Sequence, residues 1–214
     1  MLLTEFDANR QAIINPEALH EPLEGFPKIA VSCFSRLTFQ RMLEMFPHEL
    51  IYETSMANVA IPIYKLVIDD NELAIFNAPV GSSACVGILE DIFVLGADKL
   101  VLFGTCGVLD EDIKETSIII PSHALRDEGT SFHYVEASDE IAVNVGVLDH
   151  FRSYLNERQI SHKEGKVWTT DGIYRETNGK LKARKAAGAI CVDMECPHVI
   201  GSQVCGEAAF APNH

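Results

Sequence analysis

Two segments about ninety residues apart each join an apolar, strand-like run to residues that can bind a ligand. Residues 100–107 read LVLFGTCG and end in two glycines that flank Thr105 and Cys106. Residues 189–196 read AICVDMEC and end at Met194 and the carboxylate of Glu195. Backbone next to glycine can approach an anion closely, and a carboxylate accepts hydrogen bonds from hydroxyl groups. Because ligands bind at the carboxyl ends of strands in open α/β sheets, we expect both segments to face one site.

The glycine loop at residues 104–107 has two interpretations when it is taken by itself. Its N–H groups and the Thr105 hydroxyl can hold an anion, or the glycines can merely turn the chain after a strand. The carboxylate of Glu195 has fewer alternatives, since a charge at the end of an apolar strand requires a partner.

Composition and charge narrow the class of protein. The chain has 214 residues, 47% of them hydrophobic, which is enough for one folded domain with a sizeable core. Its net charge of −14 argues against a nucleic-acid partner, which requires a basic surface. The N-terminus lacks the pattern of a signal peptide and no apolar run is long enough to span a membrane, so we expect a cytoplasmic protein without a membrane partner.

The six cysteines are scattered, several of them within apolar strands, as is typical of reduced buried thiols. Cys191, Cys196 and Cys205 lie near His198 in the sequence, but their spacing matches no standard ligand pattern. We therefore expect no metal site.

Hydrophobic periodicity predicts strands that alternate with helices. Strands are expected at residues 28–34, 59–68, 72–78, 99–103, 117–121, 166–170 and 190–194. Helices are expected at about 35–46, 84–95, 141–155 and 180–187. A turn at residues 69–71 makes the second and third strands a hairpin. The pattern predicts a single α/β domain with a mixed central β-sheet flanked by helices, residues 28–196, after an N-terminal arm, residues 1–27, and before an atypical tail, residues 197–214.

Five segments in this order resemble the nucleoside phosphorylase family, which includes purine nucleoside and uridine phosphorylases and their nucleosidase relatives. They are residues 32–36 (SCFSR), 100–107, 126–134 (RDEGTSFHY), 168–177 (WTTDGIYRET) and 189–196. The resemblance implies a nucleoside phosphorylase/hydrolase-like fold and phosphorolysis of a nucleoside to free base and ribose 1-phosphate. It also implies inorganic phosphate as co-substrate, no metal or organic cofactor, and a homo-oligomer, either a dimer or a hexamer.

The resemblance also implies roles for individual residues. Gly104, Thr105 and Arg36 fall on phosphate-binding positions, and Met194 and Glu195 fall on the ribose-binding pair. The base-binding segment corresponds to Asp171, Ile173 and Tyr174. His133 falls near the sugar and base, although a structural role for it is equally consistent with the sequence. His20 and His48 are candidates to reach the site of a neighbouring subunit.

The sequence departs from the family pattern in three places. Many relatives carry an arginine where this chain has Leu102, and one lost charged phosphate contact costs about 1.5–3 kcal/mol. Residues 177–179 lack the polar pair of uridine-specific relatives. No aspartate follows Glu195 to protonate the leaving base, so the catalytic residue is unassigned. Two alternatives therefore stay open: a nucleosidase that uses water, and a non-catalytic nucleoside-binding protein.

Overall fold

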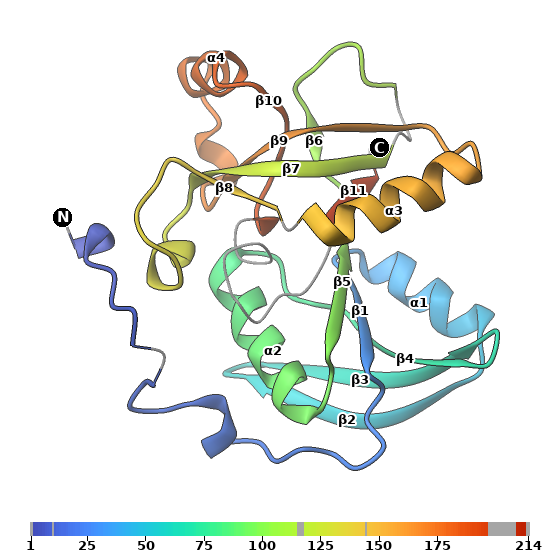
Figure 1. Cartoon of the computed structure of the whole chain (residues 1–214). Coiled ribbons are helices and arrows are strands. Elements are labelled where there is room, and N and C mark those ends of the chain that lie inside the picture. The colour runs from blue at the N-terminus through green and yellow to red at the C-terminus, as the bar shows by residue number, and fades with distance from the viewer. Residues whose placement is uncertain (1, 10, 115–117, 144, 197–208, 213–214) are drawn as a thin grey trace.

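The computed structural model describes residues 2–9, 11–114, 118–143, 145–196 and 209–212. Its strands follow the order β2-β3-β4-β1-β5-β11-β7-β9-β10-β6, and β8 pairs with β7. Figure 1 shows two groups of strands, β1 to β5 in the lower part and β6 to β10 in the upper part, with helices against each group. The predicted mixed α/β architecture is confirmed.

The first group contains two antiparallel pairs and two parallel pairs. β2 (His48–Met56), β3 (Val59–Ile68) and β4 (Asn71–Phe76) form a meander, and β1 (Ile29–Cys33) runs parallel to both β4 and β5 (Lys99–Phe103). Asp69 and Asp70 adopt positive φ angles of 48° and 64° in the tight turn before β4. The predicted hairpin therefore exists, while β2 was not predicted.

Helices cover both faces of this group. Residues of α2 (Ser82–Leu95) pack with Ala74 and Phe76, whereas Phe39 of α1 (Arg36–Met45) packs with Ile75. This alternation along β4 is what a strand buried on both faces requires. Ser35 caps α1 by accepting a hydrogen bond from the Thr38 N–H at 3.2 Å, as its sequence position predicts.

The second group is built around three parallel strands. β7 (Ile118–Asp127), β9 (His162–Thr170) and β10 (Ala189–Asp193) are parallel, while β6 (Gly107–Val108) and β8 (Glu140–Ala142) pair antiparallel to β10 and β7. α3 (Val145–Glu157) and α4 (Asn178–Ala186) complete this half. Four short 3₁₀ helices complete the description: η1 (Leu2–Thr4), η2 (Pro16–Ala18), η3 (Thr130–His133) and η4 (Ile173–Arg175).

The tail contributes a strand to the sheet, where hydrophobic periodicity predicts none. β11 (Ala209–Pro212) runs parallel to β5 and antiparallel to β7, and so joins the two groups. Four residues are too few to show a periodicity in the sequence, and their pairing partners are more than eighty residues away. The rest of the predicted tail, residues 197–208 and 213–214, lies outside the described residues.

The N-terminal arm is tied to α2 by a small polar cluster. His20 contacts the Asp91 carboxylate through Nε2 at 3.1 Å and the Tyr52 hydroxyl through Nδ1 at 3.1 Å. Thr54 donates a hydrogen bond to the same carboxylate at 2.7 Å. His20 therefore has partners within its own chain, and the structure offers no test of a role in a neighbouring subunit.

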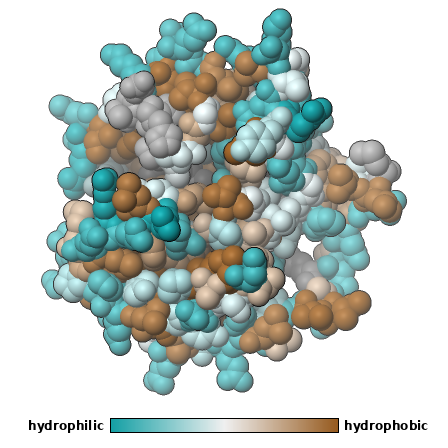
Figure 2. Space-filling model, turned by 180° about the vertical axis from the view of Figure 1, so that it is seen from behind, coloured by the Kyte–Doolittle hydropathy of each residue, from teal (hydrophilic) through white to brown (hydrophobic). Residues whose placement is uncertain are grey.

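Apolar side chains remain on the surface of the arm and elsewhere. Leu2, Ile13 and Leu19 are among the exposed ones on the arm. Figure 2 shows the apolar side chains of the back face as separate brown groups among hydrophilic ones. Among the described residues, no helix has the length and apolar character needed to cross a membrane.

Replacing His20 should loosen the arm without unfolding the domain. His20→Ala removes both contacts of a largely buried imidazole, and we expect a loss of about 0.5–1.5 kcal/mol in unfolding free energy. Limited proteolysis should cut residues 2–19 faster in this variant. His48→Ala is the matched control, because His48 is exposed on β2, and its contacts, with the Phe46 carbonyl and the Tyr64 ring, do not involve the arm. Equal cleavage rates in the two variants would contradict a tethering role for His20.

Candidate functional site

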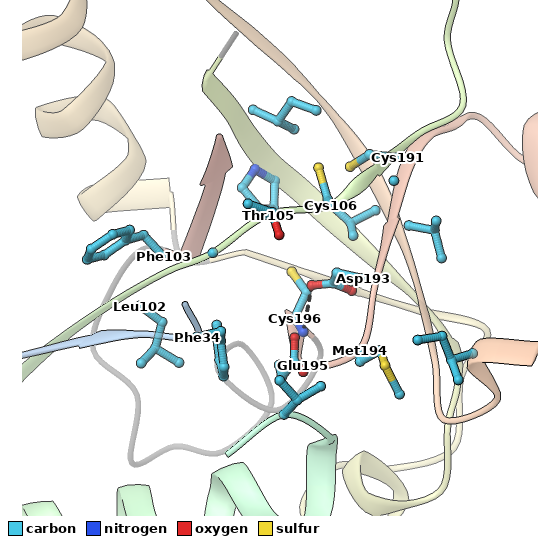
Figure 3. Close-up of a pocket in the computed structure, with 18 of the residues that line it drawn as sticks. Phe34, Leu102, Phe103, Thr105, Cys106, Cys191, Asp193, Met194, Glu195 and Cys196 are labelled. Carbon is cyan, nitrogen blue, oxygen red and sulfur yellow. Dashed lines mark hydrogen bonds between the residues drawn. The ribbon is translucent and has the colours of Figure 1, made fainter. Parts of the chain in front are cut away.

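A cavity of about 360 Å³ lies where the carboxyl ends of β5 and β10 face each other. It has the size of a small-molecule site and is lined mostly by apolar side chains with a few polar groups. Figure 3 shows Thr105 and Cys106 on one side of the cavity and Met194 and Glu195 on the other, with Asp193 and Cys196 between them. The two sequence segments predicted to share a site are therefore adjacent in space.

The glycine loop follows β5 directly and approaches an aromatic ring. A Cβ atom placed on Gly104 would lie 2.9 Å from Cδ2 of Phe34, which also lines the cavity. Glycine at this position is therefore explained by the packing of Phe34, whether or not the loop also binds an anion.

Leu102 precedes the loop. It has no exposed surface, and its side chain belongs to the hydrophobic core around α2.

The end of β10 is attached to the first residues of α2. The Gly81 N–H donates a hydrogen bond to Oε1 of Glu195 at 2.9 Å, and the Ser82 hydroxyl donates one to the Met194 carbonyl at 2.6 Å. Gly81 is the N-cap of α2, so the Glu195 carboxylate lies at the positive end of the helix dipole. This position stabilises a negative charge on a side chain that is only 8% exposed.

Asp193 is a second carboxyl group in the cavity, and sequence reasoning missed it. Its Oδ2 accepts a hydrogen bond from the Cys196 N–H at 3.0 Å, and its Oδ1 bonds to the Thr169 hydroxyl. Burial, together with the nearby negative charge of Glu195, raises the pKa of Asp193 to about 8. Asp193 is therefore a neutral carboxylic acid at neutral pH.

Three cysteines lie around Asp193. Cys106, Cys191 and Cys196 are buried and line the cavity. The hydrogen bond with Cys106, followed by burial, raises the pKa of Cys191, and burial raises that of Cys196. Both groups are therefore neutral thiols. Within the described ranges, no cluster of three or more His, Cys, Asp or Glu side chains is arranged to hold a metal ion.

The structure brings together five of the eight predicted site residues. Gly104, Thr105, Ile173, Met194 and Glu195 all line the cavity.

The other three lie outside the cavity lining. Arg36 is exposed at the first position of α1, one residue after Ser35, which does line the cavity. Tyr174 is 92% exposed. Asp171 accepts a hydrogen bond from the Gly129 N–H at 3.0 Å and so holds a neighbouring loop.

Charge in the cavity is one-sided. Three carboxyl residues, Glu176, Asp193 and Glu195, line it, whereas none of the described lining residues is Lys, Arg or His. Glu176 and Phe34 were also missed as site residues. Glu176 lies inside the segment 168–177 and Phe34 inside the segment 32–36, both quoted for the family resemblance, so position within those segments was the available signal.

The polar segment at residues 126–134 is held by hydrogen bonds within itself and to other parts of the chain. Arg126 is buried; its Nε donates to the Ser131 hydroxyl at 2.8 Å and one of its terminal nitrogens donates to the Glu136 carbonyl at 2.8 Å. Its guanidinium carbon lies 3.8 Å from the centre of the Phe132 ring. His133 lines a different cavity, of about 700 Å³, between the arm and α2.

Comparisons with known proteins agree with this architecture. Residues 28–208 match the family model of the Phosphorylase superfamily. A guanosine phosphorylase from Halorubrum lacusprofundi is 22% identical over 139 residues, which are 64% of this chain and 58% of the relative. A DeoD-type purine nucleoside phosphorylase from Brevibacillus brevis is 29% identical over 101 residues, 47% of this chain and 43% of the relative.

Solved structures show the same fold. A uridine phosphorylase from Vibrio fischeri superposes with a TM-score of 0.79 at 18% identity, over 95% of this chain and 86% of that one. A purine nucleoside phosphorylase from Toxoplasma gondii, in complex with immucillin-H, gives a TM-score of 0.76 at 16% identity, over 87% and 76% of the two chains. The chain spans about half the length of the curated relatives that it matches.

The packing of Phe34 against Gly104 can be tested by substitution. Gly104→Ala should displace the ring and cost about 1–3 kcal/mol in unfolding free energy, as overpacking does. Gly179→Ala in α4 is the control, because its new Cβ would meet nothing within 4 Å and should stabilise the helix by about 0.5–1 kcal/mol. Urea denaturation of both variants measures the difference. A Gly104 variant as stable as the parent protein would show that the loop and ring do not pack closely.

Proposed function

The chain belongs to the phosphorylase superfamily, and on this basis we propose that it is a pentosyltransferase that cleaves the N-glycosidic bond of a nucleoside. Inorganic phosphate is the proposed acceptor, and the products are a free base and ribose 1-phosphate. The observation that carries the proposal is that the Thr105 loop and the Met194–Glu195 pair, from two distant strands, line one cavity. No metal or organic cofactor is required for this reaction.

In the proposed complex, Glu195 binds the ribose hydroxyls and Met194 packs against the sugar. A carboxylate offers about four acceptor positions, so a bond from Gly81 is compatible with bonds from hydroxyl groups. Breaking the glycosidic bond leaves positive charge on the sugar ring. The negative charge of Glu195, fixed at the start of α2, is placed to stabilise that charge.

The base is proposed to lie at the rim of the cavity beside Ile173, with Asp171 and Tyr174 on the segment next to it. Ile173 is 56% exposed, as expected for a side chain at a cavity entrance. For phosphate, we propose the N–H groups of the Gly104 loop and the Thr105 hydroxyl. Arg36 follows Ser35 at the cavity and would supply the positive charge.

Hydrolysis by water is a second candidate, favoured by the charge of the cavity. Its described lining carries three carboxyl residues and no Lys, Arg or His, and Leu102 is buried in the core. Such a lining repels phosphate and leaves water as the more available nucleophile. Product analysis of guanosine and inosine cleavage with and without phosphate separates the two: ribose 1-phosphate indicates phosphorolysis, and ribose indicates hydrolysis.

Three further features belong to this proposal. The two curated relatives described above are named as guanosine and purine nucleoside phosphorylases, and on this basis we propose a purine nucleoside as substrate and a role in purine salvage. We propose a cytoplasmic homo-oligomer, and we propose that the exposed apolar side chains of the arm contribute to its subunit interface.

If guanosine and inosine bind without any turnover, the chain is a nucleoside-binding protein and the enzymatic proposal is wrong.

The role of Glu195 can be tested by calorimetric titration with a nucleoside. Glu195→Gln keeps an acceptor for the Gly81 N–H but loses the charge, and should weaken binding at least about tenfold, equivalent to about 1.4 kcal/mol. Glu195→Ala should weaken it further and also destabilise the fold, because the Gly81 N–H loses its partner. Glu24→Ala, which removes an exposed carboxylate on the arm, is the control. Unchanged affinity in Glu195→Gln would remove the Glu195 charge from the site.

A further inference from the structure

Three of the five described cysteines lie together at the cavity between β5 and β10. Cys106, Cys191 and Cys196 line this cavity and belong to one hydrophobic cluster. All three are thiols in the structure. A buried cysteine is by itself only a small apolar side chain. A chemical role therefore requires that two of the sulfur atoms are in contact and that a reagent can reach one of them.

Cys106 and Cys191 meet the first requirement. Their thiols are hydrogen-bonded to each other, and Figure 3 shows the two side chains next to one another. Cys196 lies beside Asp193, which accepts a hydrogen bond from its N–H. The pair that is in contact therefore joins the segment after β5 to the middle of β10.

The contact between these thiols follows from the pairing of β6 with β10. In this antiparallel pair Gly107 lies opposite Val192, and Val108 lies opposite Cys191. A Cβ atom on Gly107 would lie 2.9 Å from Cγ1 of Val192, so glycine allows the two segments to approach closely. Continued by one residue, the register places Cys106 diagonally across from Cys191 on the same face of the sheet.

Access to the pair differs between its two members. Cys106 is 8% exposed, whereas Cys191 has no exposed surface. A small polar oxidant such as hydrogen peroxide, which is little larger than water, therefore reaches Cys106 first. Cys191 lies behind it, in contact, where it can react with an oxidised Cys106 sulfur.

We propose that Cys106 and Cys191 are a redox-active thiol pair, which hydrogen peroxide converts to a disulfide that disables the cavity. In the first step, peroxide transfers an oxygen atom to the Cys106 sulfur, giving a sulfenic acid and one water molecule. The Cys191 sulfur then attacks the Cys106 sulfur and loses its proton, and the sulfenic oxygen leaves as a second water molecule. Two electrons pass from the thiol pair to peroxide.

The order of the two steps agrees with the state of Cys191. The hydrogen bond with Cys106, followed by burial, raises the pKa of Cys191, so that this group stays a protonated thiol. Peroxide reacts with the thiolate form of cysteine. Cys191 is therefore the second sulfur to react, and Cys106 is the first.

A disulfide at this place requires the backbone to move. Diagonal neighbours in a sheet lie about 7–8 Å apart, whereas the Cα atoms of a disulfide usually lie about 4.4–6.8 Å apart. β10 is held by pairing with both β9 and β6, so the movement falls on the segment that contains Thr105. A strained disulfide of this kind is readily reduced by thiols, which makes the modification reversible.

The effect on activity rests on the proposed cleavage of a nucleoside, whereas formation of the disulfide does not. A displacement of about 1 Å in an active site can lower the rate by about 10²-fold. We therefore expect the disulfide to lower inosine cleavage by about this factor.

The test is to treat the protein with hydrogen peroxide and to divide the sample between peptide mapping by mass spectrometry and an inosine assay. The expected result is a linked pair of peptides that contain Cys106 and Cys191, lighter than the two thiol peptides by two hydrogen atoms. Inosine cleavage should fall by about 10²-fold and return after reduction with dithiothreitol. Mapping is needed because Cys205 lies outside the described residues.

Three variants separate the pair from other oxidation. Cys106→Ala should show the same inosine activity before and after peroxide. Cys191→Ala should accumulate a sulfenic acid on Cys106, which dimedone traps. Cys196→Ala is the matched control, since it removes another buried thiol of the same cavity, and it should still be inactivated reversibly.

A disulfide between Cys106 and Cys196, or no disulfide after peroxide, would overturn the assigned pair. A disulfide between Cys106 and Cys191 with unchanged inosine cleavage would overturn its effect on the cavity. A protein that cleaves no nucleoside before treatment would contradict the proposed function alone, because peptide mapping still detects the disulfide. Calorimetric titration with inosine then measures its effect on the cavity, and equal affinity before and after peroxide would overturn that effect.

Discussion

The hydrogen bonds between the start of α2 and the end of β10 are the constraint on which the site depends. Gly81 and Ser82 lie in one half of the structure, and Met194 and Glu195 lie in the other, more than 110 residues away in sequence. These bonds hold the two halves at the distance that leaves a cavity between β5 and β10. Gly81 can make its bond because its φ angle of 99° is available to glycine at little cost.

The same contact decides the electrostatics of the cavity. By placing Glu195 at the positive end of α2, the fold supplies a fixed negative charge in a largely apolar space. Burial, and after it this charge, raises the pKa of Asp193 to about 8, so that Asp193 remains protonated at neutral pH. The Gly81 contact thus fixes the charge of Glu195 in the cavity, and that charge contributes to the raised pKa of Asp193.

Locally encoded features of the fold could be predicted from the sequence. The cap at Ser35, the turn at Asp69 and Asp70, and the glycine that ends α2 at Gly96 each depend on a few neighbouring residues. Features decided by distant partners could not be predicted. β2 is stabilised by pairing with β3, the long β7 by pairing with β9, and β11 by insertion between β5 and β7.

In the site, too, residues marked by the local sequence could be predicted, and those decided by distant partners could not. Thr105 and Glu195 were found because each ends an apolar run, and their meeting follows from the general placement of ligands at strand ends. Asp193 was missed because it lies inside the predicted strand 190–194. Only its contacts with Thr169 and Cys196 show how its carboxyl group is held at the cavity. Tyr174 is 92% exposed, whereas Ile173, its neighbour in η4, lines the cavity, and the sequence pattern does not distinguish the two.

A crystal structure of the chain with inosine bound tests the central claim most directly, namely that the ends of β5 and β10 form one nucleoside site. The account predicts that the ribose hydroxyls lie within hydrogen-bond distance of Glu195, with the sugar against Met194 and the base towards Ile173. It also predicts that the bond from the Gly81 N–H to Glu195 persists in the complex. Inosine bound elsewhere, such as in the cavity beneath the N-terminal arm, with the space between Thr105 and Glu195 empty, would contradict it.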